Sequence, residues 1–467
     1  MPNSSNSLRT SAELSAAAVI ALAAGVWIAG AENPWASGLI AVIAALCLAQ
    51  TLGIILKDGD IFAPPALFIA FTAIFYIIRP LAILNASPTV VQSFSQADMC
   101  AALAIVILST VCFYAGYWLP MNKPLARKLP VGSPYWSRQR TYALAAAILA
   151  LSCLAWWLFL RHVGGWLYWM LNLHYGVHHL RAGVGHLYVL ASFGGLAFIV
   201  LYAYALRWQG SRVAPWAVAL VTLPILLSLG ERGMLIVWVL MALALYHYLG
   251  RRLSWQRAAL YLVPVVVIFL AVGIWREQTT GATGSLQARQ SAAFQGSLTS
   301  FDMLLYIVHS TPAELDYQWG RFIPAFITTP VPRAIFPDKL DTIALYVNDH
   351  LFGWRRGTTI ALSLPGEGFV NAGLLGVALW ALLLGGLSRT AYEYLQLHRR
   401  NVSAVVLYAL WIALLIGFFR GGLTDFPAAM ALVRIGFMAG VIWLLGCGVT
   451  AGAVGRRCVE QQRGKAS

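Results

Sequence analysis

The stretch LPILLSLGERGMLIVWVLMALAL (residues 223–245) decides the fold class of this chain. It is apolar on both sides of an acid and a base, Glu231 and Arg232, which stand at its centre. Gly230 and Gly233 flank the two charges and permit a tight turn. The stretch therefore predicts two membrane-crossing helices. The charged pair is either a plain turn between them or the edge of a site at the membrane surface.

Similar apolar runs recur along the whole chain. Its 467 residues are 60% hydrophobic and 10% charged, whereas soluble globular chains carry about 25% charged residues. Each run approaches the ~20 residues that a helix needs to cross ~30 Å of hydrocarbon. We therefore expect an all-α polytopic integral membrane protein with about twelve transmembrane helices. They are expected near residues 13–31, 36–56, 61–78, 99–119, 141–160, 187–206, 214–230, 233–250, 258–275, 368–388, 402–419 and 427–450.

The charge distribution predicts how these helices are oriented. If the N-terminus is cytoplasmic, the cytoplasmic loops and termini contain 19 of the 32 Lys and Arg residues and only five of the 17 acids. This distribution obeys the positive-inside rule, so we expect both termini in the cytoplasm. The net charge of +15 is then explained by topology and implies no nucleic-acid partner.

The expected topology divides the chain into three parts. Residues 1–275 form nine helices with short basic cytoplasmic loops, residues 276–367 form a large periplasmic loop, and residues 368–467 form three helices and a basic tail. The loop contains SFDMLLYIVH (300–309) and RFIPAFITTPVPRAIFPDK (321–339), which are apolar but too short or too rich in proline to span. We expect short interfacial helices there, packed on the membrane.

Cysteine and histidine patterns do not predict a metal site. The six cysteines form no CxxC pair and are typical of small buried hydrophobic residues. His174 and His178 have the i, i+4 spacing of a helical metal-binding pair, but no acidic or cysteine cluster accompanies them. The chain also lacks a phosphate-binding glycine loop and a GxSxG motif. We therefore expect neither a metal nor a cofactor.

Basic residues on the expected outer side are almost all arginine, twelve of thirteen. A guanidinium group is planar and always charged, and it can bind a phosphate through two parallel hydrogen bonds. Arg232, Arg276 and Arg420 lie at the outer mouths of helices, at the depth of a lipid pyrophosphate headgroup. For any one arginine, an interfacial contact or an ion pair is the alternative. Taken together, they indicate a pyrophosphate site.

The stretch ALSLPGEGFVNAGLLG (361–376) leads into the tenth expected helix. Glu367 is a candidate general base for a sugar hydroxyl, kept ionised by the helix dipole. Asn371, one turn later, could orient a sugar. An ordinary first-turn acid is the alternative reading of Glu367. Asp338 and Asp425 are weaker candidates for the base.

Four short stretches resemble the Wzy-like O-antigen polymerases, the oligosaccharide repeat-unit polymerases of bacterial inner membranes. They are RAGVGHLYVL (181–190), LLSLGERGMLIVWVL (226–240), VPRAIFPDK (331–339) and SLPGEGFVNAGLLG (363–376). The number of spans and the large late loop are similar too. The resemblance implies a GT-C-like polymerase/ligase architecture in the inner membrane, with the active face in the periplasm.

The resemblance also implies an activity, that of a membrane glycosyltransferase. It would join undecaprenyl-pyrophosphate-linked repeat units into O-antigen or a related surface polysaccharide. Arginine residues would stabilise the charge on the pyrophosphate leaving group, and Glu367 would deprotonate the acceptor hydroxyl. The implied pyrophosphate ligands are Arg181, Arg232, Arg276 and Arg420, with Glu231 holding Arg232 in place. Arg333 and Lys339 would hold the second lipid-linked substrate.

Two alternative functions remain open. An O-antigen ligase, which transfers finished glycan to the lipid A core, shares the architecture and would also use outer arginines. A lipid-linked oligosaccharide transporter would place charges along a central pathway and show paired repeats. Here the charges gather at one face, and no repeat is visible. The expected partners are lipid-linked glycans and membrane lipid, with a chain-length regulator protein as a further candidate.

Overall fold

The computed structural model describes residues 33–446, apart from residues 58–59, 85–93, 172–182, 230–231, 334 and 354–359 and nearly all of 255–298. The described residues form helices and connecting turns, without a strand among them. Eight of these helices are long and apolar enough to cross a membrane. The part of the chain that the structure describes is therefore all-helical, as predicted, and its apolar helices are those of a polytopic membrane protein.

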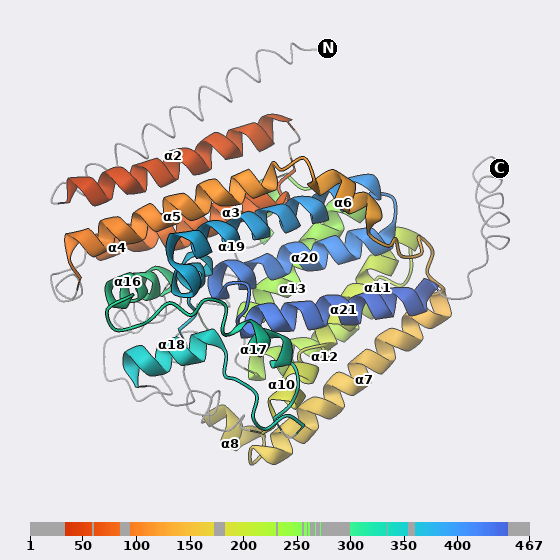
Figure 1. The fold of residues 1–467 in the computed structure, drawn as a ribbon. Helices are drawn as coiled ribbons and strands as arrows, with labels where there is room; N and C mark the ends of the chain where they lie inside the picture. Colours follow the sequence, from red (N-terminus) through yellow and green to blue (C-terminus); the bar gives the residue numbers. More distant parts are fainter. Residues whose placement is uncertain are drawn as a thin grey trace, which may run out of the picture.

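The long helices run side by side in one bundle (Figure 1). In chain order they are α2 (Pro34–Lys57), α3–η1–α4 (Pro64–Ala73, Ile74–Ile78, Arg79–Leu84), α5 (Gln96–Tyr117), α7 (Arg138–His162), α10 and α11 (Gly185–Ala191, Gly194–Trp208), α12 (Val213–Ser228), α13–η3 (Arg232–Leu245, Tyr246–Gly250), α19 (Leu364–Leu397), α20 (Val402–Gly421) and α21 (Phe426–Gly446). The short helices are α6 (Asn122–Lys128), α8 (Trp166–Leu171), α16 (Ser300–Ser310), α17 (Ile323–Thr328) and α18 (Ile343–Phe352).

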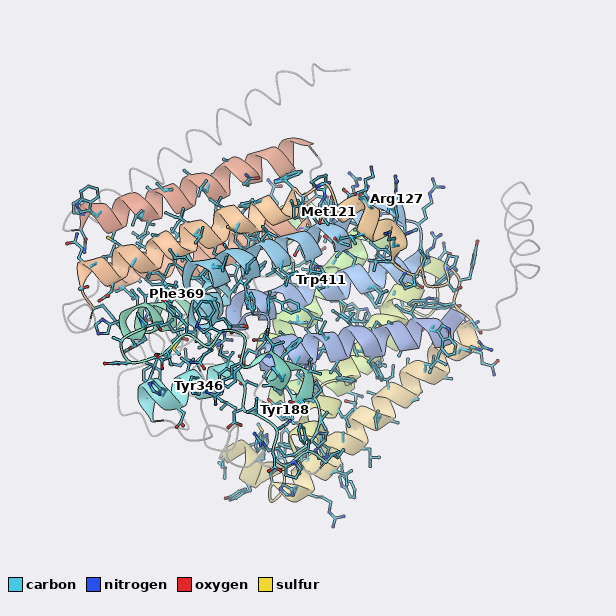
Figure 2. The ribbon with its side chains drawn as sticks, viewed as in Figure 1. Met121, Arg127, Tyr188, Tyr346, Phe369 and Trp411 are labelled. Carbon is cyan, nitrogen blue, oxygen red and sulfur yellow. The ribbon has the colours of Figure 1, made fainter. Side chains whose placement is uncertain are left out.

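The two ends of the bundle differ. In Figure 1, α16 and α18 lie at the left-hand end and α6 at the right-hand end. Figure 2 shows Tyr346 and Phe369 at the first end and Met121 and Arg127 at the second. We call them the Glu367 end and the Asp60 end, after a buried carboxylate in each.

The predicted spans agree with the helices wherever the structure describes them. Ten of the twelve overlap a described helix, although α12 has only 16 residues. The spans predicted at 13–31 and, nearly entirely, at 258–275 lie outside the described residues. The number of transmembrane helices therefore stays a prediction.

One predicted span follows a different path from the expected one. The helix expected at 368–388 is interrupted, because Ala372 and Gly373 have non-helical dihedral angles within α19. Residues 13 apart in a straight helix are about 20 Å apart along its axis, yet Trp380 Nε1 donates to Glu367 Oε1 over 2.9 Å. The first part of α19, about two turns long, therefore folds back onto the second.

Glycine permits this fold-back. A Cβ atom on Gly368 would lie 2.8 Å from the Cα of Val377, and one on Gly376 would lie 2.0 Å from the carbonyl oxygen of Gly368. Further along α19, a Cβ atom on Gly385 would lie 2.0 Å from the carbonyl oxygen of Phe113 in α5. Small residues allow membrane helices to approach this closely. The glycines thus fix both the fold-back and the contact between α5 and α19.

Two polar contacts fasten α16 to the Glu367 end. Arg79 of α4 binds Asp302 of α16 through both carboxylate oxygens, with Nε–Oδ2 2.9 Å and Nη2–Oδ1 2.6 Å. His309 Nδ1 of α16 lies 3.1 Å from Asp98 Oδ2 of α5. A paired, two-pronged arginine contact of this kind has a fixed geometry. The segment that contains α16 is therefore held against the bundle next to the start of α19.

Candidate functional site

Glu367 is the centre of a polar cluster at the Glu367 end. Its side chain is fully buried, and its carboxylate accepts hydrogen bonds from Trp380 Nε1 (2.9 Å) and from the backbone N–H of Thr424 (3.0 Å). The Thr424 hydroxyl donates to the same oxygen, Oε1. A buried carboxylate is tolerated only when hydrogen bonds replace its lost hydration. Glu367 therefore depends on the segment after α20.

That segment approaches Glu367 closely because it contains glycine. Gly422 has a φ of +95°, which disfavours residues with a Cβ atom. A Cβ atom at this position would lie 1.6 Å from Glu367 Oε2. The corner formed by Arg420, Gly421 and Gly422 thus packs its backbone directly on the carboxylate.

A second set of contacts joins the same corner to the beginning of α19. Ser363 caps the helix, since its hydroxyl accepts from the backbone N–H of Gly366, and its own φ is +68°. The Ser363 N–H donates to the backbone carbonyl of Arg420 over 2.8 Å. The side chain of Arg420 is exposed. Arg420 therefore has an exposed side chain on a backbone that is fixed by the hydrogen bond from Ser363 and by the packing of Gly422 on Glu367.

Asn371 connects the same helix to the preceding segment. Its Nδ2 donates to the backbone carbonyl of Glu367 (3.0 Å), and its Oδ1 accepts from Gly320 N–H (3.3 Å). Its backbone carbonyl accepts from Trp319 N–H over 2.7 Å. Asn371 is nearly fully buried. The structure thus brings together Glu367, Asn371 and Arg420 of the predicted site residues, with Asn371 as a backbone-binding group.

Asp425 is a second buried acid close to this cluster. It directly precedes α21, and its backbone carbonyl accepts from the N–H groups of Ala428 and Ala429. Burial raises the pKa of Asp425 to about 6, and hydrogen bonds with the backbone of Phe426 and the side chain of Thr342 partly offset this shift. Asp338, the other weaker candidate base, is exposed.

Arg333 and Lys339 bind their own loop. Lys339 Nζ donates to the carbonyl oxygens of Thr329 (2.9 Å) and Val331 (2.5 Å), just after α17. Arg333 Nη1 donates to the carbonyl oxygens of Pro337 (3.0 Å) and Lys339 (3.1 Å), and its Nη2 pairs with Asp341. Both side chains thus stabilise the loop, and their predicted contact with a lipid-linked substrate stays a prediction.

The other residues predicted to bind pyrophosphate are three arginines, with Glu231 beside one of them. Arg181, Glu231 and Arg276 lie outside the described residues, and Arg232 is the first residue of α13. Whether they join Arg420 in one pyrophosphate site stays a prediction.

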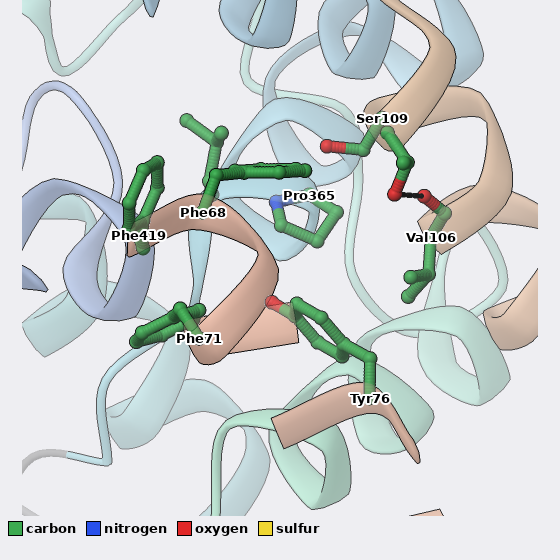
Figure 3. Close-up of a pocket in the computed structure, with 9 residues that line it drawn as sticks. Phe68, Phe71, Tyr76, Val106, Ser109, Pro365 and Phe419 are labelled. Carbon is green, nitrogen blue, oxygen red and sulfur yellow. Dashed lines mark hydrogen bonds between the residues drawn. The ribbon is translucent and has the colours of Figure 1, made fainter. Parts of the chain in front are cut away.

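An aromatic pocket lies beside the start of α19 (Figure 3). Its cavity volume is only about 10 Å³, close to the room that one water molecule needs. Its lining residues are Phe68, Phe71, Tyr76, Val106, Ser109, Thr110, Leu364, Pro365 and Phe419. Phe419 directly precedes Arg420, and Pro365 lies two residues before Glu367. The polar cluster therefore adjoins an apolar hollow inside the bundle.

Four residues of the cluster were not predicted from the sequence. Trp380 and Thr424 are 13 and 57 residues from Glu367 along the chain, so no local pattern connects them. Two others had a weak signal in the sequence. Gly422 belongs to the glycine pair that follows Arg420, and Ser363 directly precedes the stretch Leu-Pro-Gly-Glu. A serine ahead of Pro and an acid is typical of a helix start.

The family model described as "O-antigen polysaccharide polymerase Wzy" matches residues 17–447, nearly the whole chain. No curated protein and no solved structure gives a significant match. The family match includes every residue of the cluster around Glu367.

Proposed function

The chain belongs to the O-antigen polysaccharide polymerase Wzy family, and from this we propose that it joins undecaprenyl-pyrophosphate-linked repeat units at the outer leaflet of the bacterial inner membrane. The family supports O-antigen polymerisation in general. The polar cluster around Glu367, with exposed Arg420 beside it, supports the Glu367 end as the reacting face.

The reaction is a glycosyl transfer. A hydroxyl at the non-reducing end of a new lipid-linked repeat unit attacks the sugar carbon that bears the pyrophosphate of the growing chain. The new C–O bond forms as the C–O bond to pyrophosphate breaks, and the hydroxyl proton passes to a base. Undecaprenyl pyrophosphate leaves, and the chain is longer by one unit on the new lipid.

Charge supports the orientation of the bundle in this proposal. The short helix α6 at the Asp60 end exposes Lys123, Arg127 and Lys128. Basic residues near the ends of membrane helices favour the cytoplasmic side. The Glu367 end then faces the periplasm, where lipid-linked repeat units would be available.

We assign Arg420 the task of stabilising the leaving group. It is exposed at the end of α20, and its backbone is held by Ser363 and by the packing of Gly422 on Glu367. A fixed cation placed where negative charge develops lowers the barrier without reorganising during the reaction. Of the four arginines predicted as pyrophosphate ligands, it is the one whose backbone contacts join it to the Glu367 cluster.

Glu367 acts through this corner, as a positioning residue. Its carboxylate has no exposed surface and already accepts from Trp380 and Thr424. To take a proton from a sugar it would first have to leave these donors. Its contacts instead support a fixed position of the Arg420 corner relative to α19.

The experiment that tests the function uses purified protein in lipid nanodiscs with an authentic lipid-linked repeat unit. A ladder of products that remain on the lipid supports polymerisation. Transfer in a single step, only after lipid A core is added, would identify a ligase. Inertness in both assays, with movement of the substrate across the bilayer, would identify a transporter.

A further inference from the structure

The segment Trp319–Leu340 presents an unusual surface for a loop. Six of its large apolar side chains are exposed. They are Trp319, Ile323, Ile327, Ile335, Phe336 and Leu340. Trp319, Ile327 and Ile335 have exposed fractions of 72%, 70% and 74%. An exposed cluster of this kind marks a contact with a membrane or with another protein.

The opposite side of this segment is packed on the protein. Phe322 and Ala325 are buried in a small core with Met303 of α16 and Val347 of α18. The exposed side chains therefore lie on a different face from the one that packs on the protein. The segment has an inner apolar face that the protein covers and an outer apolar face that nothing in the described chain covers.

Two of the segment's four charged side chains, those of Arg333 and Lys339, are turned onto the loop itself, whereas Arg321 and Asp338 are exposed. Lys339 turns its ammonium group onto carbonyl oxygens at the end of α17, and partial burial lowers its pKa. Arg333 binds carbonyl oxygens of the loop and pairs with Asp341. Both cations thus satisfy the loop's own backbone, as is required where water is scarce.

The location of the segment indicates what covers the outer face. Helix α17 packs against α21, one of the helices long enough to span a membrane, and Figure 1 shows the two next to one another. Phe426 and Leu432 of α21 are themselves exposed. On a spanning helix, exposed apolar side chains contact lipid. The exposed side chains of α17, Ile323 and Ile327, therefore belong to a helix that lies against a lipid-facing one.

The backbone holds the segment firmly in this position. Trp319 has a φ of +47°, an unfavourable conformation for a residue with a Cβ atom. It is maintained by the hydrogen bond from its N–H to the Asn371 carbonyl. Gly320 N–H donates to the Asn371 side chain as well. The root of the segment is therefore attached to the helix that bears Glu367.

From these observations we infer that the Trp319–Leu340 segment inserts its exposed side chains into the lipid leaflet beside α21. The partner is the acyl region of the bilayer, with Trp319 at the headgroup level where tryptophan is favoured. Interfacial segments typically bury an apolar face about 5–10 Å deep, at the boundary between headgroups and acyl chains. The inserted segment is hydrogen-bonded to Asn371, and Asn371 is hydrogen-bonded to the backbone of Glu367. The contact with the leaflet is therefore linked to the Glu367 cluster.

Photo-crosslinking tests this contact without reference to enzymatic activity. p-Benzoylphenylalanine is placed at Ile327, and in separate variants at Ile323, in the full chain in phosphatidylcholine–phosphatidylglycerol nanodiscs. Leu432 on α21 serves as a lipid-facing positive control. Ala313, an exposed residue of the turn after α16, serves as the negative control. After irradiation, intact-protein mass spectrometry identifies the adduct.

We expect phospholipid adducts at 327 and 323 at a yield close to that at 432, and about tenfold above that at 313. If 432 forms lipid adducts but neither 327 nor 323 does, the inference is wrong. Crosslinks between two copies of the chain at 327 would assign the face to self-association instead.

Discussion

Two buried carboxylates, Glu367 and Asp60, lie at opposite ends of the bundle, and their surroundings differ in kind. Asp60 accepts from the hydroxyls of Tyr248 (2.9 Å) and Tyr392 (3.1 Å), and His247 Nε2 lies 3.7 Å away. Arg399 Nη2 lies 3.8 Å away. Glu367 accepts from an indole, a hydroxyl and a backbone N–H, and no ion pair joins it to any residue that the structure describes.

From this difference we propose that the Asp60 cluster is structural and that the Glu367 cluster is functional. Asp60, which lies just before α3, is joined to η3 and α19 through the hydroxyls of Tyr248 and Tyr392, and nearby basic groups compensate the charge of its carboxylate. Glu367 accepts a hydrogen bond from the backbone of Thr424 and packs against Gly422. Arg420, at the start of the same segment, has an exposed side chain. Trp380 and Tyr392 contact the two acids from one helix, about 18 Å apart along its axis. A change at one end can therefore be tested without disturbing the other.

The largest effect is expected for Arg420→Ala. It removes an exposed guanidinium, so the fold should persist, but the rate of chain extension should fall about 10²–10³-fold, as when a preorganised charge stabiliser is deleted. The measurement is the initial rate of ladder formation in nanodiscs. Arg127→Ala, an exposed arginine at the Asp60 end, is the control and should extend chains normally. Equal rates for both variants would remove Arg420 from the site.

Asp60→Ala should act in the opposite way, on stability. It leaves the hydroxyls of Tyr248 and Tyr392 without their acceptor, and breaking a buried charged contact costs roughly 3 kcal/mol. Thermal unfolding in detergent should shift to lower temperature, while the extension rate per folded molecule stays within about threefold of wild type. Strong loss of extension at an unchanged unfolding temperature would show that the Asp60 end takes part in function.

Gly422→Ala should disturb the Glu367 cluster through the backbone. The new Cβ atom would strain a φ of +95° and collide with Glu367 Oε2, at a cost of roughly 2 kcal/mol. Both unfolding temperature and extension rate should decrease. Gly436→Ala in α21, where a Cβ atom meets nothing within 4 Å, is the matched control. If both variants behave alike, the close approach at Gly422 is unimportant.

The smallest effect is expected for Trp380→Phe. It keeps an aromatic ring and removes one hydrogen bond to Glu367, which should cost about 1 kcal/mol. The extension rate should drop a few-fold with little change in the apparent affinity for substrate. Trp411→Phe, in the middle of α20, is the comparison. A larger loss at Trp411 would contradict the importance of the Glu367 cluster.

Sequence reasoning predicted the helices well because each span is a long apolar run, visible without any knowledge of its neighbours. It did not predict the break in α19, since Phe369, Val370 and Leu374 continue the apolar pattern across Ala372 and Gly373. The fold-back depends on Gly368 meeting Gly376, a contact between backbone atoms.

The candidate site was predictable only in part, from features that can be read at single positions of the sequence. Glu367, Asn371 and Arg420 were identified from residue type and position, and the structure brings them together. Their partners depend on tertiary contacts, as with Thr424, which is 57 residues from Glu367. The inward turn of Lys339 could not be predicted either, because it follows from the path of the backbone after α17.

The central claim is that the Glu367 end extends lipid-linked glycans and that Glu367 positions Arg420 there. The most direct measurement compares the initial rate of ladder formation for wild type, Glu367→Gln and Glu367→Ala in nanodiscs. A glutamine oxygen can still accept from Trp380 and Thr424, so Glu367→Gln should stay within about tenfold of wild type, and Glu367→Ala should be much slower. A loss of about 10²-fold or more in Glu367→Gln, with an unchanged unfolding temperature, would instead identify a general base. If wild type forms no ladder from an authentic lipid-linked repeat unit, the proposed polymerase activity is wrong.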